Sequence, residues 1–256
     1  MRTDVLETSE DAVLGGRLRL RQPLRGHRVG HDAILLAAAT GGRAGEHAVD
    51  LGAGVGAAGL ALAARVAGLK VTLVEIDAAL CALASGNARL NKLDDRVNVL
   101  ACDAEDVESL AAAGIAPSSA DRVLMNPPFH DATRQNLSPD PRRRLAHAAS
   151  PGLLPHWIAS AARLLKPQGV LTLIWRADAL AEVQSALTDV FGGVAVLPVY
   201  PRPDAPAIRV LLRAVKSGGG AGVTYPGIIL NDQDGKPTAA AEAILRGAGT
   251  LSITET

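Results

Sequence analysis

Short apolar runs alternate with amphipathic stretches along most of the chain, which is typical of strands that alternate with helices. Helical patterns follow several of the apolar runs and separate them along the chain. The runs themselves are almost continuously apolar, which predicts strands that are buried on both faces of a mainly parallel sheet. Strand-like runs occur at 47–52, 70–77, 96–103, 121–126, 169–175, 194–199 and 207–215, and helical patterns at 31–40, 57–68, 78–91, 152–165 and 178–190. The pattern predicts an α/β fold with a doubly wound sheet.

Two segments of different composition flank this alternating core. Residues 17–28 carry five arginines, one histidine and no acidic residue, after an acidic start. The stretch KSGGGAG at 216–222 is typical of a flexible break, and a short strand, a turn and a helix are predicted beyond it. We therefore expect a basic N-terminal extension (1–30), a core (31–216) and a C-terminal appendage (217–256).

The charge balance excludes a whole-surface attraction to polyanions, because 26 basic side chains are matched by 26 acidic ones. Cys81 and Cys102 are the only cysteines, and they predict neither a disulfide framework nor a metal cluster. The first residues mix acidic and apolar side chains, unlike a signal peptide, and each long apolar run is too short or too interrupted to span a membrane. These features favour a reducing cytoplasm.

A glycine-rich turn follows the first strand of the predicted core and opens a helix. It reads Asp50-Leu51-Gly52-Ala53-Gly54-Val55-Gly56, and missing side chains let backbone N–H groups approach a ligand closely. Gly54, Gly56 and Gly59 also satisfy the G-x-G-x-x-G pattern of dinucleotide sites, so a nicotinamide or flavin cofactor has to be considered. A turn that only permits close packing is the plainer alternative.

Acidic residues follow the next two strands and narrow the choice of cofactor. Glu75 ends the second strand, where an acid holds ribose hydroxyls in dinucleotide and methyl-donor sites alike. Asp103 follows the third strand. Together with Asp50 before the glycines, this arrangement resembles the S-adenosylmethionine-dependent methyltransferases.

The motif Asn126-Pro127-Pro128-Phe129 ends the fourth strand and favours chemistry on an amino group. An exocyclic amine is a poor nucleophile because its lone pair is delocalised into the ring. The Asn126 side chain and the backbone carbonyl of Pro127 offer acceptors for its N–H groups, and Phe129 offers a stacking surface. The bland alternative is a strand that ends in a proline turn beside a core phenylalanine.

The segments DLGAGVG, VEID, CDA and LMNPPFH resemble the bacterial tRNA(Val) adenine-37 N6-methyltransferase family, and the resemblance extends from about residue 11 to nearly the end. It implies a Rossmann-like class I fold with seven strands, the last antiparallel, and no metal. It further implies that S-adenosylmethionine is bound by Asp50, Gly52, Gly54, Gly56, Glu75 and Asp103, and that Asn126, Pro127 and Phe129 hold the N6 amine of a tRNA adenine beside the anticodon. Similar motifs occur in guanine N2- and in protein glutamine methyltransferases, so these substrates remain alternatives, as does a non-catalytic scaffold that binds cofactor and RNA.

Two arginine clusters favour a nucleic-acid substrate. They consist of Arg17, Arg19, Arg21, Arg25 and Arg28 before the core and of Arg142, Arg143 and Arg144 after the amino-group motif. Both could reach a phosphate backbone near the site, although arginine is abundant throughout the chain and often merely solvated. Asp32 is expected to cap the early helix rather than to touch the cofactor.

Overall fold

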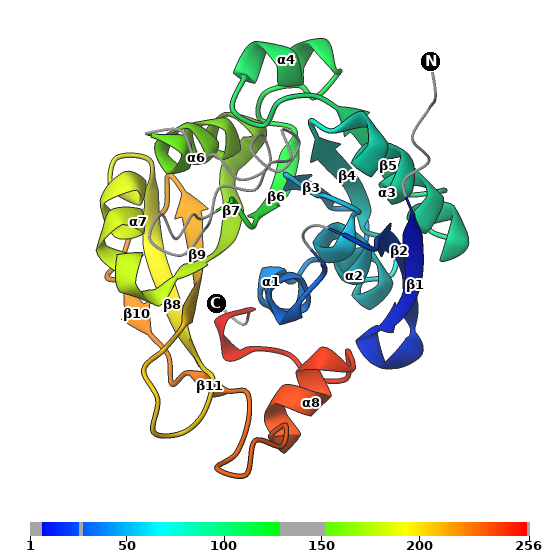
Figure 1. The fold of residues 1–256 in the computed structure, drawn as a ribbon. Coiled ribbons are helices and arrows are strands. Elements are labelled where there is room, and N and C mark those ends of the chain that lie inside the picture. The colour runs from blue at the N-terminus through cyan, green and yellow to red at the C-terminus, as the bar shows by residue number, and fades with distance from the viewer. Residues whose placement is uncertain (1–6, 26–27, 129–151, 255–256) are drawn as a thin grey trace.

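The computed structural model describes residues 7–25, 28–128 and 152–254. Its centre is a nine-stranded sheet with helices on both faces (Figure 1). The strands follow the order β10-β8-β9-β7-β6-β3-β4-β5, and β11 also pairs with β8. Their bounds are β3 His47–Leu51, β4 Lys70–Glu75, β5 Val97–Ala101, β6 Ala120–Met125, β7 Leu165–Arg176, β8 Phe191–Tyr200, β9 Arg209–Lys216, β10 Val223–Thr224 and β11 Ile228–Ile229.

The seven longer strands confirm the predicted doubly wound sheet. β3, β4, β5, β6 and β7 pair in parallel, whereas β9, the last of the seven in the chain, runs antiparallel to both β7 and β8. The two-residue strands β10 and β11 extend the sheet beyond the seven that the resemblance implies. The chain reverses its direction of travel across the sheet at β3 and β6, where ligands of such folds bind.

Two apolar clusters cover the two faces of the sheet. The first packs α1 His31–Thr40, α2 Ala57–Arg65 and α3 Ala78–Leu90 against one face. The second packs α6 Leu153–Leu164 and α7 Leu180–Leu187 against the other, with the short helix α4 Val107–Ala112 at its edge. Successive residues of one strand join different clusters, as Leu124 and Met125 do in β6, because successive side chains of a strand point to opposite faces.

The N-terminal segment forms a β-hairpin, which the sequence reading missed. β1 Thr8–Val13 pairs antiparallel with β2 Leu18–Pro23, and the 3-10 turn η1 Leu14–Gly16 joins them. Leu18 and Leu20 are buried, whereas Arg19 and Arg21 between them are exposed. The alternation in RLRLRQ is therefore a strand signal, because a period of two places every second residue on one face.

The C-terminal segment adds α8 Ala239–Leu245 and the 3-10 turn η3 Ser252–Thr254, and both contact α1. Ile244, Leu251 and Ile253 are buried in the same apolar cluster as α1 and α2. A further short 3-10 turn, η2 Ala177–Ala179, links β7 to α7. None of the helices that the structure describes is long and apolar enough to cross a membrane.

Candidate functional site

The predicted site residues gather at the carboxyl ends of neighbouring strands. In the sheet register, Leu51 at the end of β3 pairs with Val74 of β4 on one side and with Met125 of β6 on the other. The residues that follow these three are Gly52, Glu75 and Asn126. The fold therefore brings the glycine loop, the acid and the amino-group motif to one edge, as the alternating pattern predicts.

The glycines of the loop differ in what surrounds them. A Cβ on Gly52 would lie 2.3 Å from the Trp157 ring, and one on Gly59 would lie 2.3 Å from Leu73. A Cβ on Gly56 would come within 2.9 Å of Leu73, so all three glycines permit close packing of the loop on its own core. Gly54 has a left-handed φ of +58° and nothing within 4 Å of its Cβ position. Gly54 thus marks the part of the loop that faces open space.

Glu75 is held by the loop that it is predicted to accompany. Its Oε2 accepts a hydrogen bond from the Gly54 N–H at 2.8 Å, and its Oε1 accepts one from the Asp77 N–H at 2.9 Å. A carboxylate has lone pairs for further donors, so both oxygens can still accept bonds from hydroxyl groups. Asp77 in turn caps α3, which fixes the end of β4 relative to that helix.

Asp50 lies beneath the loop rather than at its surface. It is 2% exposed, and its Oδ2 accepts a hydrogen bond from the Gly59 N–H at 2.8 Å. Gly59 is in the first turn of α2, so Asp50 binds one of the free N–H groups at the start of that helix. Burial raises the pKa of Asp50 to about 7, because the charged carboxylate is disfavoured away from water. Its predicted contact with a cofactor stays a prediction.

The third acid stands nearby, at the end of β5. Asp103 is partly exposed, and its Oδ1 accepts a hydrogen bond from the Glu105 N–H at 2.9 Å. Ile76, directly after Glu75, is 57% exposed although it is large and apolar. An exposed apolar side chain at this edge is available to contact a ligand. The sequence reading missed Ile76, and its signal is an apolar residue between two acids at a strand end.

The Asn126 side chain carries an unused acceptor. Its Oδ1 is buried and has no hydrogen-bond partner among the residues that the structure describes. An orphaned buried acceptor costs about 1–3 kcal/mol unless a ligand satisfies it, so it is a place where a donor binds well. Pro127, the next residue, is buried, whereas Phe129 lies outside the described residues.

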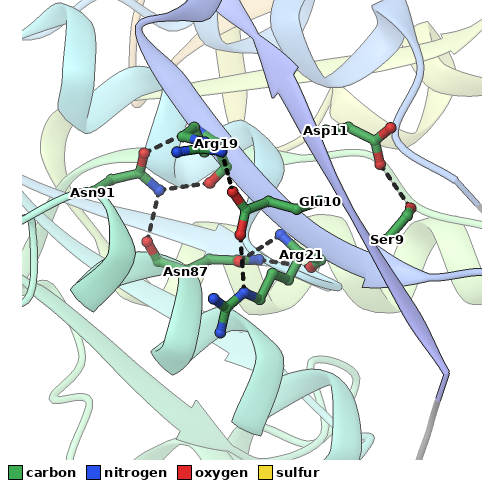
Figure 2. Close-up of polar contacts among 7 residues, drawn as sticks. All are labelled: Ser9, Glu10, Asp11, Arg19, Arg21, Asn87 and Asn91. Carbon is green, nitrogen blue, oxygen red and sulfur yellow. Dashed lines mark hydrogen bonds and ion pairs between the residues drawn. The ribbon is translucent and has the colours of Figure 1, made fainter.

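The arginines of the hairpin make contacts within the protein. Arg19 and Arg21 both form ion pairs with Glu10 of β1, at 2.6 Å and 3.1 Å, as Figure 2 shows. Arg28 pairs with Asp11 at 2.8 Å. The pairs are largely exposed, and such pairs are worth at most about 1 kcal/mol, so phosphate groups could replace the acids.

The other predicted RNA-contacting arginines are scattered. Arg17 donates to the Gly247 carbonyl at 3.0 Å, and Arg25 is exposed. The cluster Arg142, Arg143 and Arg144 lies outside the described residues.

The expectation that Asp32 caps α1 is wrong. The N-cap residue is Gly30, and Asp32 sits within the first turn and pairs with Arg209 of β9 at 2.9 Å. The helix starts at His31, as the pattern predicts, so Asp32 lies one residue inside it, where a negative charge in the first turn interacts favourably with the helix dipole. The ion pair ties α1 to the sheet.

Two other features bear on the location and kind of site. A shallow hollow lined by residues such as His47, Lys70 and Asp121 lies at the amino ends of β3, β4 and β6, opposite the glycine loop, and contains none of the predicted site residues. Over the described parts of the chain, no three His, Cys, Asp or Glu residues are close enough to hold a metal ion.

Three curated relatives are similar in sequence to parts of this chain. A tRNA1(Val) (adenine(37)-N6)-methyltransferase of Porphyromonas gingivalis is 34% identical over 61% of this chain, and the match spans only 62% of that relative's length. An enzyme of the same name from Shewanella amazonensis is 27% identical over 86% of this chain and 91% of its own. A release factor glutamine methyltransferase of Chlorobaculum tepidum is 32% identical over 61% of this chain and 54% of its own.

A solved structure and a family model each match most of this chain. A crystal structure described as a predicted O-methyltransferase, protein Atu636 from Agrobacterium tumefaciens, superposes with a TM-score of 0.73 at 28% identity, over 86% of this chain and 98% of that one. The family model described as the methyltransferase small domain matches residues 29–199, which include the glycine loop, Glu75, Asp103 and the Asn126 motif. The chain therefore belongs to the methyltransferase small domain family.

Proposed function

We propose that this protein transfers a methyl group from S-adenosylmethionine to an exocyclic amino group, and that this group is N6 of an adenine in tRNA next to the anticodon. The observation that carries the proposal is the buried Oδ1 of Asn126, which has no partner among the described residues, beside a loop with open space at Gly54. An acceptor at this edge suits a ligand that brings N–H donors, and an amino group brings two.

The residues present fit the methyl donor. Gly54 leaves room for close backbone approach, and Glu75 keeps lone pairs for ribose hydroxyls. Ile76 and Asp103 follow the neighbouring strands β4 and β5, and both would contact the adenine. The bound cofactor supplies an electrophilic methyl group on a sulfonium, so the protein needs no metal to activate the transfer. What remains for the chain is to bind, align and desolvate the two reactants.

Asn126 and Pro127 perform the alignment. The Asn126 Oδ1 accepts one N–H of the target amine, and the Pro127 carbonyl accepts the other. Two acceptors hold the nitrogen in a more pyramidal form, which localises its lone pair towards the methyl group. As the N–C bond forms, the S–C bond of the donor would break to leave S-adenosylhomocysteine. The proton of the alkylated nitrogen is acidic and would pass to water, so a strong general base is unnecessary.

The adenine of a tRNA is the preferred substrate because two of the reported relatives are named tRNA1(Val) (adenine(37)-N6)-methyltransferases. One of these two matches along most of its length. The arginines of the β1–β2 hairpin would contact the phosphate backbone. With a tRNA substrate, we expect the protein to act in the cytoplasm. The release factor relative favours a second candidate, a protein glutamine, whose side-chain amide would meet the same Asn126 acceptor.

The test combines substrate choice with one substitution. Purified protein is incubated with labelled S-adenosylmethionine and either unmodified tRNA or release factor, and the methylated product is identified by mass. Asn126→Ala should lower kcat/KM by about 100-fold or more, the loss typical of a transition-state acceptor, while S-adenosylhomocysteine binds as before. Asn98→Ala removes an exposed asparagine of β5 and is the control.

Each outcome assigns the substrate differently. N6-methyladenosine in tRNA that disappears with Asn126→Ala supports the proposal. If only release factor is labelled, the substrate is a protein glutamine and not a tRNA adenine. Full activity of Asn126→Ala would overturn the role assigned to Asn126.

A further inference from the structure

Three elements meet at one buried amide, that of Asn87 in α3. Its side chain is fully buried, and its Oδ1 accepts a hydrogen bond from the Arg21 N–H of β2 at 2.7 Å. Its Nδ2 donates to the Arg21 carbonyl at 3.0 Å and, with its other hydrogen, to the Val55 carbonyl at 3.0 Å. Asn87 therefore bonds the hairpin on one side and the glycine loop on the other.

Asn91, one helical turn later, repeats the contact to the hairpin (Figure 2). Its remaining side-chain bond goes to the Asn87 carbonyl and not to the loop. It accepts from the Arg19 N–H at 2.8 Å and donates to the Arg19 carbonyl at 2.7 Å. Four residues of helix rise about 6 Å and two residues of strand about 6.8 Å, so the two asparagines match alternate residues of the strand. Together they satisfy the outer edge of β2 as a neighbouring strand would.

The contact to Val55 is made in addition to this docking. The Val55 carbonyl belongs to the peptide whose N–H, that of Gly56, donates to the Ala53 carbonyl at 2.8 Å and closes the turn around Gly54. Because C=O and N–H of one peptide point in opposite directions, fixing the carbonyl also fixes the N–H. Asn87 thus helps to set the shape of the turn at the one loop glycine that faces open space.

We propose that Asn87 is a positioning residue for the methyl-donor loop and that it couples the docking of the β1–β2 hairpin to methyl-donor binding. The inference rests on the proposed function, because it takes the loop to be the donor site. A hairpin that is firmly docked holds the Asn87 amide in place, and the amide holds the loop. By reciprocity, a ligand that orders the loop also tightens the docking of β2.

The two asparagines provide a matched pair of variants. Asn87→Ala and Asn91→Ala each remove the side-chain bonds to one residue of β2, but only Asn87→Ala removes the bond to Val55. Calorimetry with S-adenosylhomocysteine should give a Kd raised about fivefold for Asn87→Ala, the equivalent of one hydrogen bond of about 1 kcal/mol. The Kd of Asn91→Ala should stay within about twofold of that of the unaltered protein. Equal affinities for all three proteins, or equal losses in both variants, would overturn the proposal.

A second measurement uses the unaltered chain, in case Asn87→Ala fails to fold. Saturation with S-adenosylhomocysteine should slow hydrogen exchange at the Arg21 amide, which Asn87 holds, more than at the Arg19 amide, which Asn91 holds. Binding with no change at Arg21 would contradict the coupling and leave the proposed function standing. Absence of any binding to the unaltered protein would instead contradict the proposed function itself.

Discussion

Gly52 and Gly54 lie two residues apart in the same loop, but substitution of Gly52 should reduce stability whereas substitution of Gly54 should reduce cofactor affinity. Gly52→Ala drives a methyl group into the Trp157 ring, and we expect the free energy of unfolding to fall by about 2 kcal/mol or more. Gly54→Ala meets no neighbour and costs only the backbone strain of about 1 kcal/mol, but its methyl group enters the proposed cofactor space. Its Kd for S-adenosylhomocysteine should rise about tenfold or more. Urea unfolding and calorimetry on both variants check the pair, and a reversed pattern would contradict the assigned roles.

Asp50 should make the stability of the protein depend on pH. Burial raises its pKa from 3.8 to about 7, so its contribution to folding is fully present below about pH 4 and is lost as pH rises through about 7. Asn in its place keeps an oxygen for the Gly59 N–H but does not ionise. As pH rises from about 5 to about 8, the free energy of unfolding should therefore fall less in Asp50→Asn than in the unaltered protein. Urea unfolding at several pH values measures this difference. Parallel pH profiles would show that Asp50 does not titrate in this window.

At the scale of elements, the hairpin carries arginines whose charge is partly cancelled by its own acids. Arg19 and Arg21 share Glu10, so Glu10→Gln would leave two cations for an RNA backbone. We expect tRNA affinity to rise a few-fold and the slope of log K against log salt to steepen by up to about 1, because each neutralised phosphate releases counterions.

The matched control for this change is Glu182→Gln, which removes the same charge from an exposed position on α7, at the other end of the sheet. Filter binding of tRNA over a range of salt concentrations compares the two variants. If both raise the affinity equally, net charge alone is responsible and the hairpin has no special contact.

At the scale of the whole molecule, the C-terminal segment completes the apolar cluster around α1. Ile253 is fully buried in η3, which contacts α1 although it lies more than 200 residues later in the chain. Ile253→Ala should lower the free energy of unfolding by about 2–4 kcal/mol, whereas Thr250→Ala at an exposed position should change it by less than about 0.5 kcal/mol. Denaturant unfolding measures both. A small loss for Ile253→Ala would show that the segment is dispensable to the core.

The order of strands and helices could be predicted from the sequence because it depends on local periodicity. Nearly continuous apolar runs predict buried parallel strands, and a parallel sheet necessarily aligns their carboxyl ends. Gly52, Glu75 and Asn126 could therefore be assigned to one edge although they are far apart in the chain. The unpredicted hairpin had a local signal too, the alternation of leucine and arginine in 17–21, but its charge suggested a basic extension that contacts RNA.

The local sequence by itself thus determined the sheet, its binding edge and the residue types placed there. Only the tertiary structure decided which groups face open space and which are buried. The packing of Trp157 on Gly52 and the bonds of Asn87 to Arg21 and Val55 join residues that lie 32 to 105 positions apart in the chain. The burial of Asp50 depends on several elements that pack around it. No pattern within one segment encodes such contacts, because each depends on how separate elements pack in three dimensions.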